Sequence, residues 1–240
     1  MDLLADLVGE VKPHPVFFVG IGYFDTLVVS KYGAGLSSTL RPNINEHKSV
    51  KDAGHLTEKT LKDLAEYIFS DNPLMVSIGM AAINASLPMP THFETKNAKD
   101  IIIEKGSGKK VGIIGHFPFV NEIKKTASTL YIFEQNPGIG DLPSSRIPEF
   151  LPLCDVVAIT GMSIMNRSFE YIVEHTKKEA YKIVLGPSTP LSPRLFDFGI
   201  DAISGTIVED IEKTKAYILE GAPFRNIKGI KLITMFKDHA

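Results

Sequence analysis

The second part of the chain alternates short β-branched runs with helical patterns, and this alternation constrains the fold more than any other feature. Strands are predicted at 111–114, 129–133, 155–159, 182–185, 201–203 and 230–235. Helical patterns lie between several of them, and one runs from 208 to 220. Strands separated by helices pair in parallel, with helices on both faces of the sheet. We therefore predict an α/β domain with a doubly wound parallel sheet over residues 96–240.

The first part of the chain follows a different pattern. The runs 16–20 and 26–30 predict two antiparallel strands, and the glycine-containing stretch 33–38 is expected to form a turn or an edge connection. Two helical patterns follow, and the polar stretch 88–100 resembles a connection to the second part. These features predict a smaller α+β domain over residues 1–95.

The composition indicates an ordinary soluble protein and excludes several classes of partner. The 240 residues carry 26 basic and 28 acidic side chains, a net charge of −2, which is not the charge of a nucleic-acid-binding surface. No apolar run approaches the ~20 residues that span a bilayer, and the single cysteine, Cys154, excludes internal disulfides. We expect a cytoplasmic protein with a small-molecule or metal ligand, without membrane or nucleic-acid partners, and leave a homo-oligomer open.

A histidine follows one of the predicted strands directly. The run 111–114 is succeeded by Gly115, His116 and Phe117, and Pro118 then fixes the direction of the chain. In open α/β sheets, ligands bind beyond the carboxyl ends of the strands. His116 is therefore placed for catalysis or for metal binding. The alternative is a loop histidine bonded to a backbone carbonyl group.

Polar residues also follow two further strands. Glu134 ends the second strand, and Gly186, Ser188 and Thr189 follow the strand at 182–185. If Glu134 and His116 follow adjacent parallel strands, their side chains can converge as ligands of a borderline metal or as a proton-transfer pair. The 186–190 loop contains two prolines, which donate no N–H, so it differs from a phosphate-binding loop.

The spacing of Gly115 and Glu134 fits a dinucleotide site only in part. Glu134 lies roughly 20 positions beyond Gly115, as such a site requires, but the second and third glycines of the motif are missing. Phe117 and Pro118 would also obstruct a pyrophosphate that approached the backbone. NAD is therefore disfavoured as a cofactor, and a divalent or heavy metal is left open.

Taken in order, the segments 115–119, 155–161, 186–191 and 204–208, together with Glu134, resemble the putative heavy-metal chelation family. The segments 33–38 and 77–85 look like its amino-terminal companion domain. The resemblance implies a first domain like the amino-terminal domain of enolases, a Rossmann-like second domain, and a ligand site in the cleft between them. The expected ligand contacts are Gly33, Gly35, Asn84, His116, Phe117, Glu134, Thr160, Gly186, Ser188 and Thr189.

Three functional hypotheses remain at this point. The first is a site that binds or processes a heavy metal or a metal chelate, with His116 and Glu134 as metal ligands. The second is an enzyme acting on a polar or anionic metabolite, with His116 as general acid or base and with Ser188 and Thr189 as orienting donors. The third is a non-catalytic metabolite sensor. The sequence leaves open whether the protein is an enzyme.

Overall fold

The computed structural model describes residues 2–42 and 49–237, and the chain divides into two compact units. Unit 1 comprises Met1–Thr91, Pro187–Ser192 and Gly205–Leu232, and unit 2 comprises His92–Gly186, Pro193–Ser204 and Ile233–Ala240. The first change of unit lies close to the predicted boundary between residues 95 and 96. Two later segments of the chain, however, group with unit 1, so the units are discontinuous in sequence.

Unit 1 contains a three-stranded antiparallel sheet in the order β1-β2-β3. Its strands are β1 (Val16–Ile21), β2 (Asp25–Ser30) and β3 (Ala34–Ser38). The predicted antiparallel pairing of the first two strands is confirmed. The prediction of a turn or edge connection at 33–38 is wrong, because this segment is a strand whose residues alternate between the two faces of the sheet. Its small and polar residues obscure that alternation in the sequence.

Two helices of unit 1, α3 (Pro73–Ser86) and α10 (Ile211–Leu219), pack against this sheet. On the α3 side, the hydroxyl of Ser37 donates to the carbonyl oxygen of Ser77 at 2.7 Å. The neighbouring residue Leu36 packs in a cluster with Ile218 of α10. Because successive residues of a strand point to opposite faces, the two helices cover opposite faces of the sheet.

Two helices of unit 1, α2 (Leu61–Ala65) and α3, begin at side-chain capping residues. Thr60 and Asp63 form a capping box at α2, and the side chain of Asn72 accepts from the N–H of Leu74 at the start of α3. The other helical elements are α1 (Leu3–Glu10) and the 3-10 helices Leu56–Glu58, Glu66–Phe69 and Phe224–Asn226.

The second sheet has, among the described residues, seven strands in the order β10-β9-β8-β7-β4-β5-β6. Its strands are β4 (Lys110–Ile114), β5 (Thr129–Glu134), β6 (Leu142–Pro143), β7 (Val156–Thr160), β8 (Tyr181–Leu185), β9 (Ala202–Val208) and β10 (Ile230–Phe236). Every neighbouring pair from β9 to β6 is parallel, which confirms the predicted parallel sheet. Counted along the chain, these six strands have the order of the Rossmann fold.

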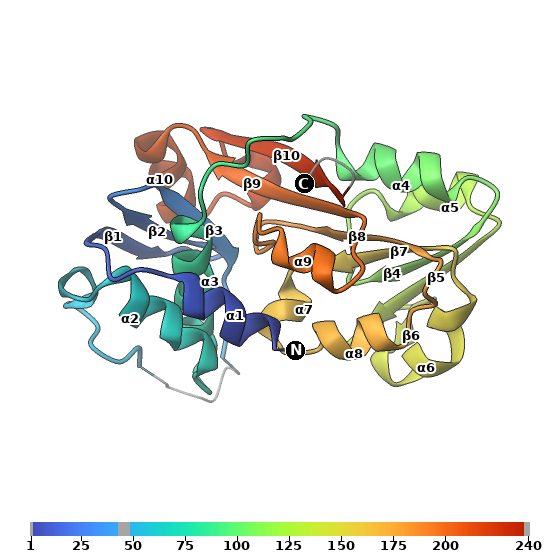
Figure 1. Ribbon diagram of the computed structural model, residues 1–240, viewed down its shortest axis with the longest axis horizontal. Helices are drawn as coiled ribbons and strands as arrows, with labels where there is room; N and C mark the ends of the chain where they lie inside the picture. The colour runs from blue at the N-terminus through green and yellow to red at the C-terminus, as the bar shows by residue number, and fades with distance from the viewer. Residues whose placement is uncertain (1, 43–48, 238–240) are drawn as a thin grey trace. The chain divides into compact units, whose positions relative to one another are not determined.

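Helices cover both faces of this sheet within unit 2 (Figure 1). α4 (Ala98–Gly106) and α5 (Val120–Thr126) lie on one face, and α7 (Met162–Met165), α8 (Phe169–Glu174) and α9 (Arg194–Asp197) lie on the other. The remaining elements are α6 (Ile147–Phe150) and the 3-10 helices Ser144–Arg146 and Leu151–Leu153. The doubly wound arrangement expected from the sequence is thus confirmed.

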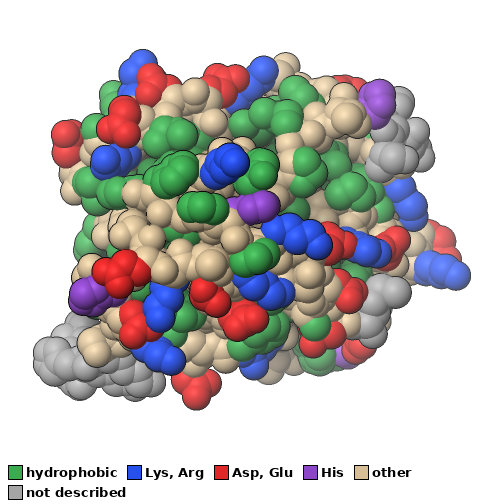
Figure 2. Space-filling model, turned by 60° about the vertical axis from the view of Figure 1, so that its left-hand side comes forward, with side chains coloured by type: hydrophobic (Ala, Val, Ile, Leu, Met, Phe, Trp, Pro, Cys, Tyr) green, Lys and Arg blue, Asp and Glu red, His purple; other side chains and the backbone are tan. Residues whose placement is uncertain are grey.

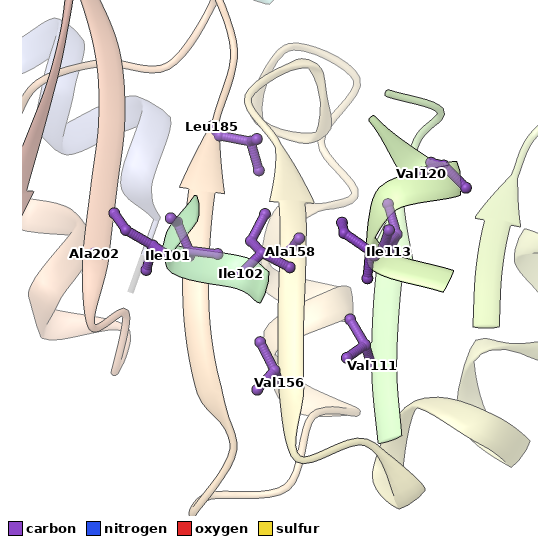
Figure 3. Packing of buried hydrophobic residues seen from close by; sticks show 11 residues of the cluster. Ile101, Ile102, Val111, Ile113, Val120, Val156, Ala158, Leu185 and Ala202 are labelled. Atoms are coloured by element: carbon purple, nitrogen blue, oxygen red, sulfur yellow. The ribbon is translucent and has the colours of Figure 1, made fainter. Parts of the chain in front are cut away.

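The core under α4 shows why the β-branched runs form the sheet. Ile101 and Ile102 of α4 pack in one buried cluster with Val111, Ile113 and Val156 of the central strands (Figure 3). Burial of each such side chain contributes roughly 1.5–3 kcal/mol. Alternate residues of the same strands face the other layer, so both faces of the sheet are apolar and both require helices.

The surface carries no single dominant charge on the side shown in Figure 2, where acidic and basic side chains are interspersed among apolar groups. Among the described residues, no helix has both the length and the apolar character needed to cross a membrane.

Candidate functional site

A cavity of about 300 Å³ lies at the carboxyl edge of the parallel sheet in unit 2. We call it the unit-2 cavity. Four predicted contacts, His116, Phe117, Glu134 and Thr160, line it. The complete lining is Ile114, Gly115, His116, Phe117, Phe133, Glu134, Gln135, Ser144, Ile147, Thr160, Met162, Ser163, Asn166, Ser168, Tyr171 and Ile172.

The strand order explains why the cavity is found here. β4 is paired with β5 on one side and with β7 on the other, so the direction of the chain reverses at β4. Loops leaving the carboxyl ends of β4 and β7 diverge at such a switch point and leave a crevice between them. Gly115 and Thr160 stand at these two strand ends.

The backbone at Gly115 makes a tight exit from β4. Its φ angle is +96°, a left-handed conformation that favours glycine. A Cβ atom at this position would lie 3.2 Å from the Thr160 side chain. The glycine therefore allows the chain to turn beside β7 and to present the next residue, His116, to the cavity.

The imidazole of His116 is accessible and has an acidic neighbour. Its side chain is 57% exposed, and Nδ1 lies 3.8 Å from Oδ2 of Asp141, a carboxylate that is only 10% exposed. The same Oδ2 accepts from the backbone N–H of Gly138 at 3.0 Å, which holds the carboxylate in place. At 3.8 Å the contact is too long for a hydrogen bond but close enough for an ion pair with a protonated ring.

The other polar groups of the cavity are mostly neutral. The Ser163 hydroxyl donates to the carbonyl oxygen of Thr160 at 2.7 Å, and Oδ1 of Asn166 accepts from the Ser168 hydroxyl at 2.7 Å. Among the described residues that line it, Glu134 is the one carboxylate, and none is a lysine or an arginine. The cavity is therefore able to hold a polar ligand but offers little to neutralise an anion.

A metal centre built from protein ligands alone does not fit the described residues. Residues 2–42 and 49–237 contain no group of three or more histidine, cysteine, aspartate or glutamate side chains that could hold a metal ion. The only cysteine, Cys154, is buried, and burial raises the pKa of its thiol to about 12. A thiol of that kind is not the thiolate that soft metals select. His116 and Glu134 are thus at most part of a coordination shell.

A second cavity, of about 160 Å³, lies within unit 1 and accounts for three further predicted contacts, Gly33, Asn84 and Thr189. We call it the unit-1 cavity. Its lining is Tyr32, Gly33, Ala34, Asn84, Ala85, Leu87, Pro88, Met89, Pro90, Thr189, Leu191, Thr206, Ile207 and Val208. The single site shared by both parts of the chain remains a prediction.

The last three predicted contacts line neither cavity. Gly35 packs under α3, where an added Cβ would lie 2.2 Å from the backbone nitrogen of Ala85. The Ser188 hydroxyl, fully buried, accepts from the N–H of Ser38 at 2.8 Å. Gly186 has a φ angle of +119° at the end of β8. Their positions indicate a role in packing and chain direction.

Sequence reasoning missed Asp141 beside His116 and Thr206 in the unit-1 cavity. Asp141 lies in a loop with Gly138 and Gly140, and nothing in that local pattern points to a histidine more than twenty residues earlier. For Thr206 the sequence offers only a weak signal, which is its place in the segment 204–208 that resembles a family motif.

The chain is similar to proteins whose functions are unknown. A family model described as putative heavy-metal chelation matches residues 97–236, and a second model with the same description matches residues 4–87. An uncharacterized protein of Methanocaldococcus jannaschii is 29% identical over 228 residues, which are 91% of this chain and 87% of that protein.

Solved structures of the same family have the same fold. A protein of unknown function from Desulfitobacterium hafniense DCB-2 is 26% identical, has a TM-score of 0.87, and matches over 98% of both chains. Another, from Pyrococcus horikoshii, is 19% identical with a TM-score of 0.81 over 97% of both chains, a likeness of fold alone. Because the family match at residues 97–236 spans more than half of the sequence, this chain belongs to the family described as putative heavy-metal chelation.

Proposed function

We propose that the protein binds a heavy metal in the form of an organic chelate, and that the unit-2 cavity holds this chelate as cargo. The observation that carries the proposal is the lining of one cavity by His116 and Glu134, at the ends of adjacent parallel strands. An imidazole and a carboxylate are suitable partners for a metal that still has an open coordination position.

The charge of the lining favours a cationic or neutral ligand over an anionic one. Glu134 lines the cavity, Asp141 lies beside His116, and the lining contains no lysine or arginine side chain from residues 2–42 and 49–237. Two like charges about 4 Å apart repel by about 4 kcal/mol at the effective dielectric constant of a protein surface. An anionic metabolite is thus the less suitable ligand, and a metal-bearing chelate with a positive charge is the more suitable one.

The number of donors favours a chelate over a free metal ion. Structural zinc sites use four protein ligands and catalytic ones use three, whereas the described lining of this cavity has one histidine and one carboxylate. An organic chelator would supply the missing donors. The cavity volume of about 300 Å³ is at the lower end of the range for small-molecule sites.

The test measures melting temperatures with metals and chelates of different charge. Full-length protein without an affinity tag is heated with nickel salt alone, with the cationic nickel–bipyridine chelate, and with the anionic nickel–EDTA chelate. We expect the cationic chelate to stabilise the protein most, by about 2.7 kcal/mol at 100 times its Kd. Stabilisation by the EDTA chelate alone, or by the free metal alone, would contradict the proposal.

Variants assign any stabilisation to the cavity. His116→Ala should abolish the shift with nickel–bipyridine and leave the melting temperature of the free protein nearly unchanged, because the ring is 57% exposed. His92→Ala is the matched control, since His92 is an exposed histidine of the same unit and does not line the cavity. An equal loss of binding in both variants would show a nonspecific effect of surface histidines.

A second candidate function is an enzyme that acts on a neutral polar metabolite, and the contact between His116 and Asp141 favours it. A carboxylate beside an imidazole stabilises the charge that forms when the ring accepts a proton from a substrate. Incubation with pooled neutral metabolites, followed by mass spectrometry, tests this function. Turnover that is lost in His116→Asn would establish it, and the absence of any turnover would leave chelate binding as the supported function.

A further inference from the structure

We propose that the unit-1 cavity is a second ligand site, specific for an uncharged organic molecule that carries an N–H or O–H donor. The two cavities have no lining residue in common, so this inference is independent of the function proposed for the unit-2 cavity. Four separate segments of the chain line the unit-1 cavity: the start of β3, the end of α3 with residues 87–90, the segment 187–192, and the end of β9.

Unpartnered oxygen atoms mark this cavity. Three of its lining residues, Asn84, Thr189 and Thr206, each carry a buried side-chain oxygen that has no hydrogen-bond partner in the described part of the chain. Thr189 is only 2% exposed. Buried polar oxygens are nearly always hydrogen-bonded, so three exceptions around one cavity indicate groups that a bound molecule satisfies.

The orientation of the Asn84 amide defines what the ligand must supply. Its Nδ2 donates to the carbonyl oxygen of Leu36 at 2.7 Å. A carbonyl oxygen only accepts, so the amide cannot be turned around, and Oδ1 is left as the unpartnered atom. An amide oxygen is itself only an acceptor, and a ligand in contact with it must therefore carry a donor.

The other lining residues determine the charge and the size of the ligand that fits the unit-1 cavity. In the part of the chain that the structure describes, no Asp, Glu, Lys, Arg or His lines the cavity, so a charged molecule would enter without a counter-ion. Leucine, isoleucine, valine, proline and methionine side chains provide apolar contact. The volume is about 160 Å³, and cavities of about 150 Å³ are able to hold one benzene ring. The fitting ligand is a single small ring or a chain of similar size with a neutral donor group.

Three probes of nearly equal shape separate these requirements. Benzamide is neutral and carries N–H donors, acetophenone is neutral and only accepts, and benzoate is charged and only accepts. Saturation-transfer NMR with the full chain should show benzamide binding at least tenfold more tightly than the other two. Equal binding of benzamide and acetophenone, or no binding of benzamide, would overturn the proposal.

Threonine variants assign the binding to the cavity. Thr189→Val should weaken benzamide binding at least tenfold and should leave the melting temperature of the free protein unchanged or raise it, because the removed hydroxyl has no partner. Thr189→Ser should retain binding. A drop in melting temperature with Thr189→Val would instead show that the hydroxyl is satisfied within the folded protein, and it would overturn the proposal.

The matched control is Thr214→Val in the same unit. The Thr214 side chain is fully buried, and its hydroxyl donates to the carbonyl oxygen of Asp210 at 2.7 Å. Its removal should lower the melting temperature and leave benzamide binding intact. His116→Ala, which concerns the other cavity, should also leave benzamide binding intact. Loss of benzamide binding in His116→Ala would overturn the assignment to the unit-1 cavity.

Discussion

The two cavities differ in how the chain builds them. The unit-2 cavity lies where neighbouring parallel strands end, and each strand contributes the residues that directly follow it or end it, such as His116, Glu134 and Thr160. The unit-1 cavity is lined by segments that are up to about 170 positions apart in the sequence, and its functional groups are neutral oxygens. A parallel sheet thus gathers ionisable side chains at a predictable edge. The unit-1 cavity instead combines Thr189, which follows the parallel strand β8, with residues of β3, α3 and β9 that no common sequence pattern marks.

The largest expected effect concerns the packing on which the unit-1 cavity depends. An added Cβ at Gly35 would lie 2.2 Å from the nitrogen of Ala85 and 2.3 Å from the carbonyl oxygen of Ala81, both in the backbone of α3. Because both contacts are with backbone atoms, the added methyl group fits only if β3 and α3 move apart. Gly35→Ala should therefore lower the free energy of unfolding by about 4 kcal/mol or more. Urea unfolding followed by circular dichroism measures this, since the chain has no tryptophan.

Gly9→Ala provides the control for this variant. Gly9 lies in α1 of the same unit, and an added Cβ would meet nothing within 4 Å. Alanine is the better helix former by roughly 0.5–1 kcal/mol, so this variant should be slightly stabilised. If Gly35→Ala were tolerated as well as Gly9→Ala, the contact between β3 and α3 would not be rigid, and the contrast between the two cavities would weaken.

The second-largest expected effect concerns Asp25. It tests whether unit 1 has buried oxygens without a hydrogen-bond partner outside the unit-1 cavity. Asp25 is 3% exposed and lines neither cavity, and its Oδ2 has no hydrogen-bond partner among the described residues. Burial raises the pKa of its carboxyl from 3.8 to about 7. The folded protein therefore holds this proton more tightly than the unfolded chain does, and stability falls as pH rises from about 4 through about 7.

Asp25→Asn should remove this pH dependence. Relative to the variant, the wild-type protein should lose about 3–4 kcal/mol of unfolding free energy between pH 4 and pH 8, since the pKa rises from 3.8 to about 7 and each pKa unit corresponds to about 1.4 kcal/mol. Asp6→Asn, at an exposed position of α1, is the control for the loss of one carboxyl group from the same unit. If the unfolding free energies of wild type and Asp25→Asn changed with pH in the same way, the Asp25 carboxyl group would have a hydrogen-bond partner in solution. The unpartnered oxygens of the unit-1 cavity would then have to be tested in the same way.

The smallest effect concerns the unit-2 cavity. Gly115→Ala places a methyl group 3.2 Å from the Thr160 side chain, at a φ angle of +96°. Gly140 has a similar φ angle of +93° and open space around it, so Gly140→Ala measures the backbone strain alone. We expect about 1 kcal/mol of destabilisation for Gly140→Ala and about 2 kcal/mol for Gly115→Ala in thermal unfolding.

Only Gly115→Ala should also weaken binding of the nickel–bipyridine chelate, because Gly115 lines the unit-2 cavity and Gly140 does not. Equal effects of both variants on stability and on binding would show that the approach of β4 to Thr160 does not shape the site.

The parallel sheet was predictable because its determinants are local. The central strands β4, β7 and β8 are short apolar runs with a glycine directly after each, and the alternation with helices leaves few arrangements that bury both faces. β3 was not predictable by the same rule. Gly35 and Ser37 are small because they lie under α3, and this proximity has no trace in the neighbouring sequence.

For the candidate site, the sequence by itself determined that His116 and Glu134 follow strands of one sheet, because the position of a residue at a strand end is fixed by the chain. The tertiary structure alone decided that Asp141 stands beside His116, that Ser188 supports β3, and that the oxygens of Asn84, Thr189 and Thr206 surround one cavity. The physical reason is that strand ends are local properties of the chain, whereas hydrogen-bond partners and close contacts are set by the packing of segments that lie far apart in sequence.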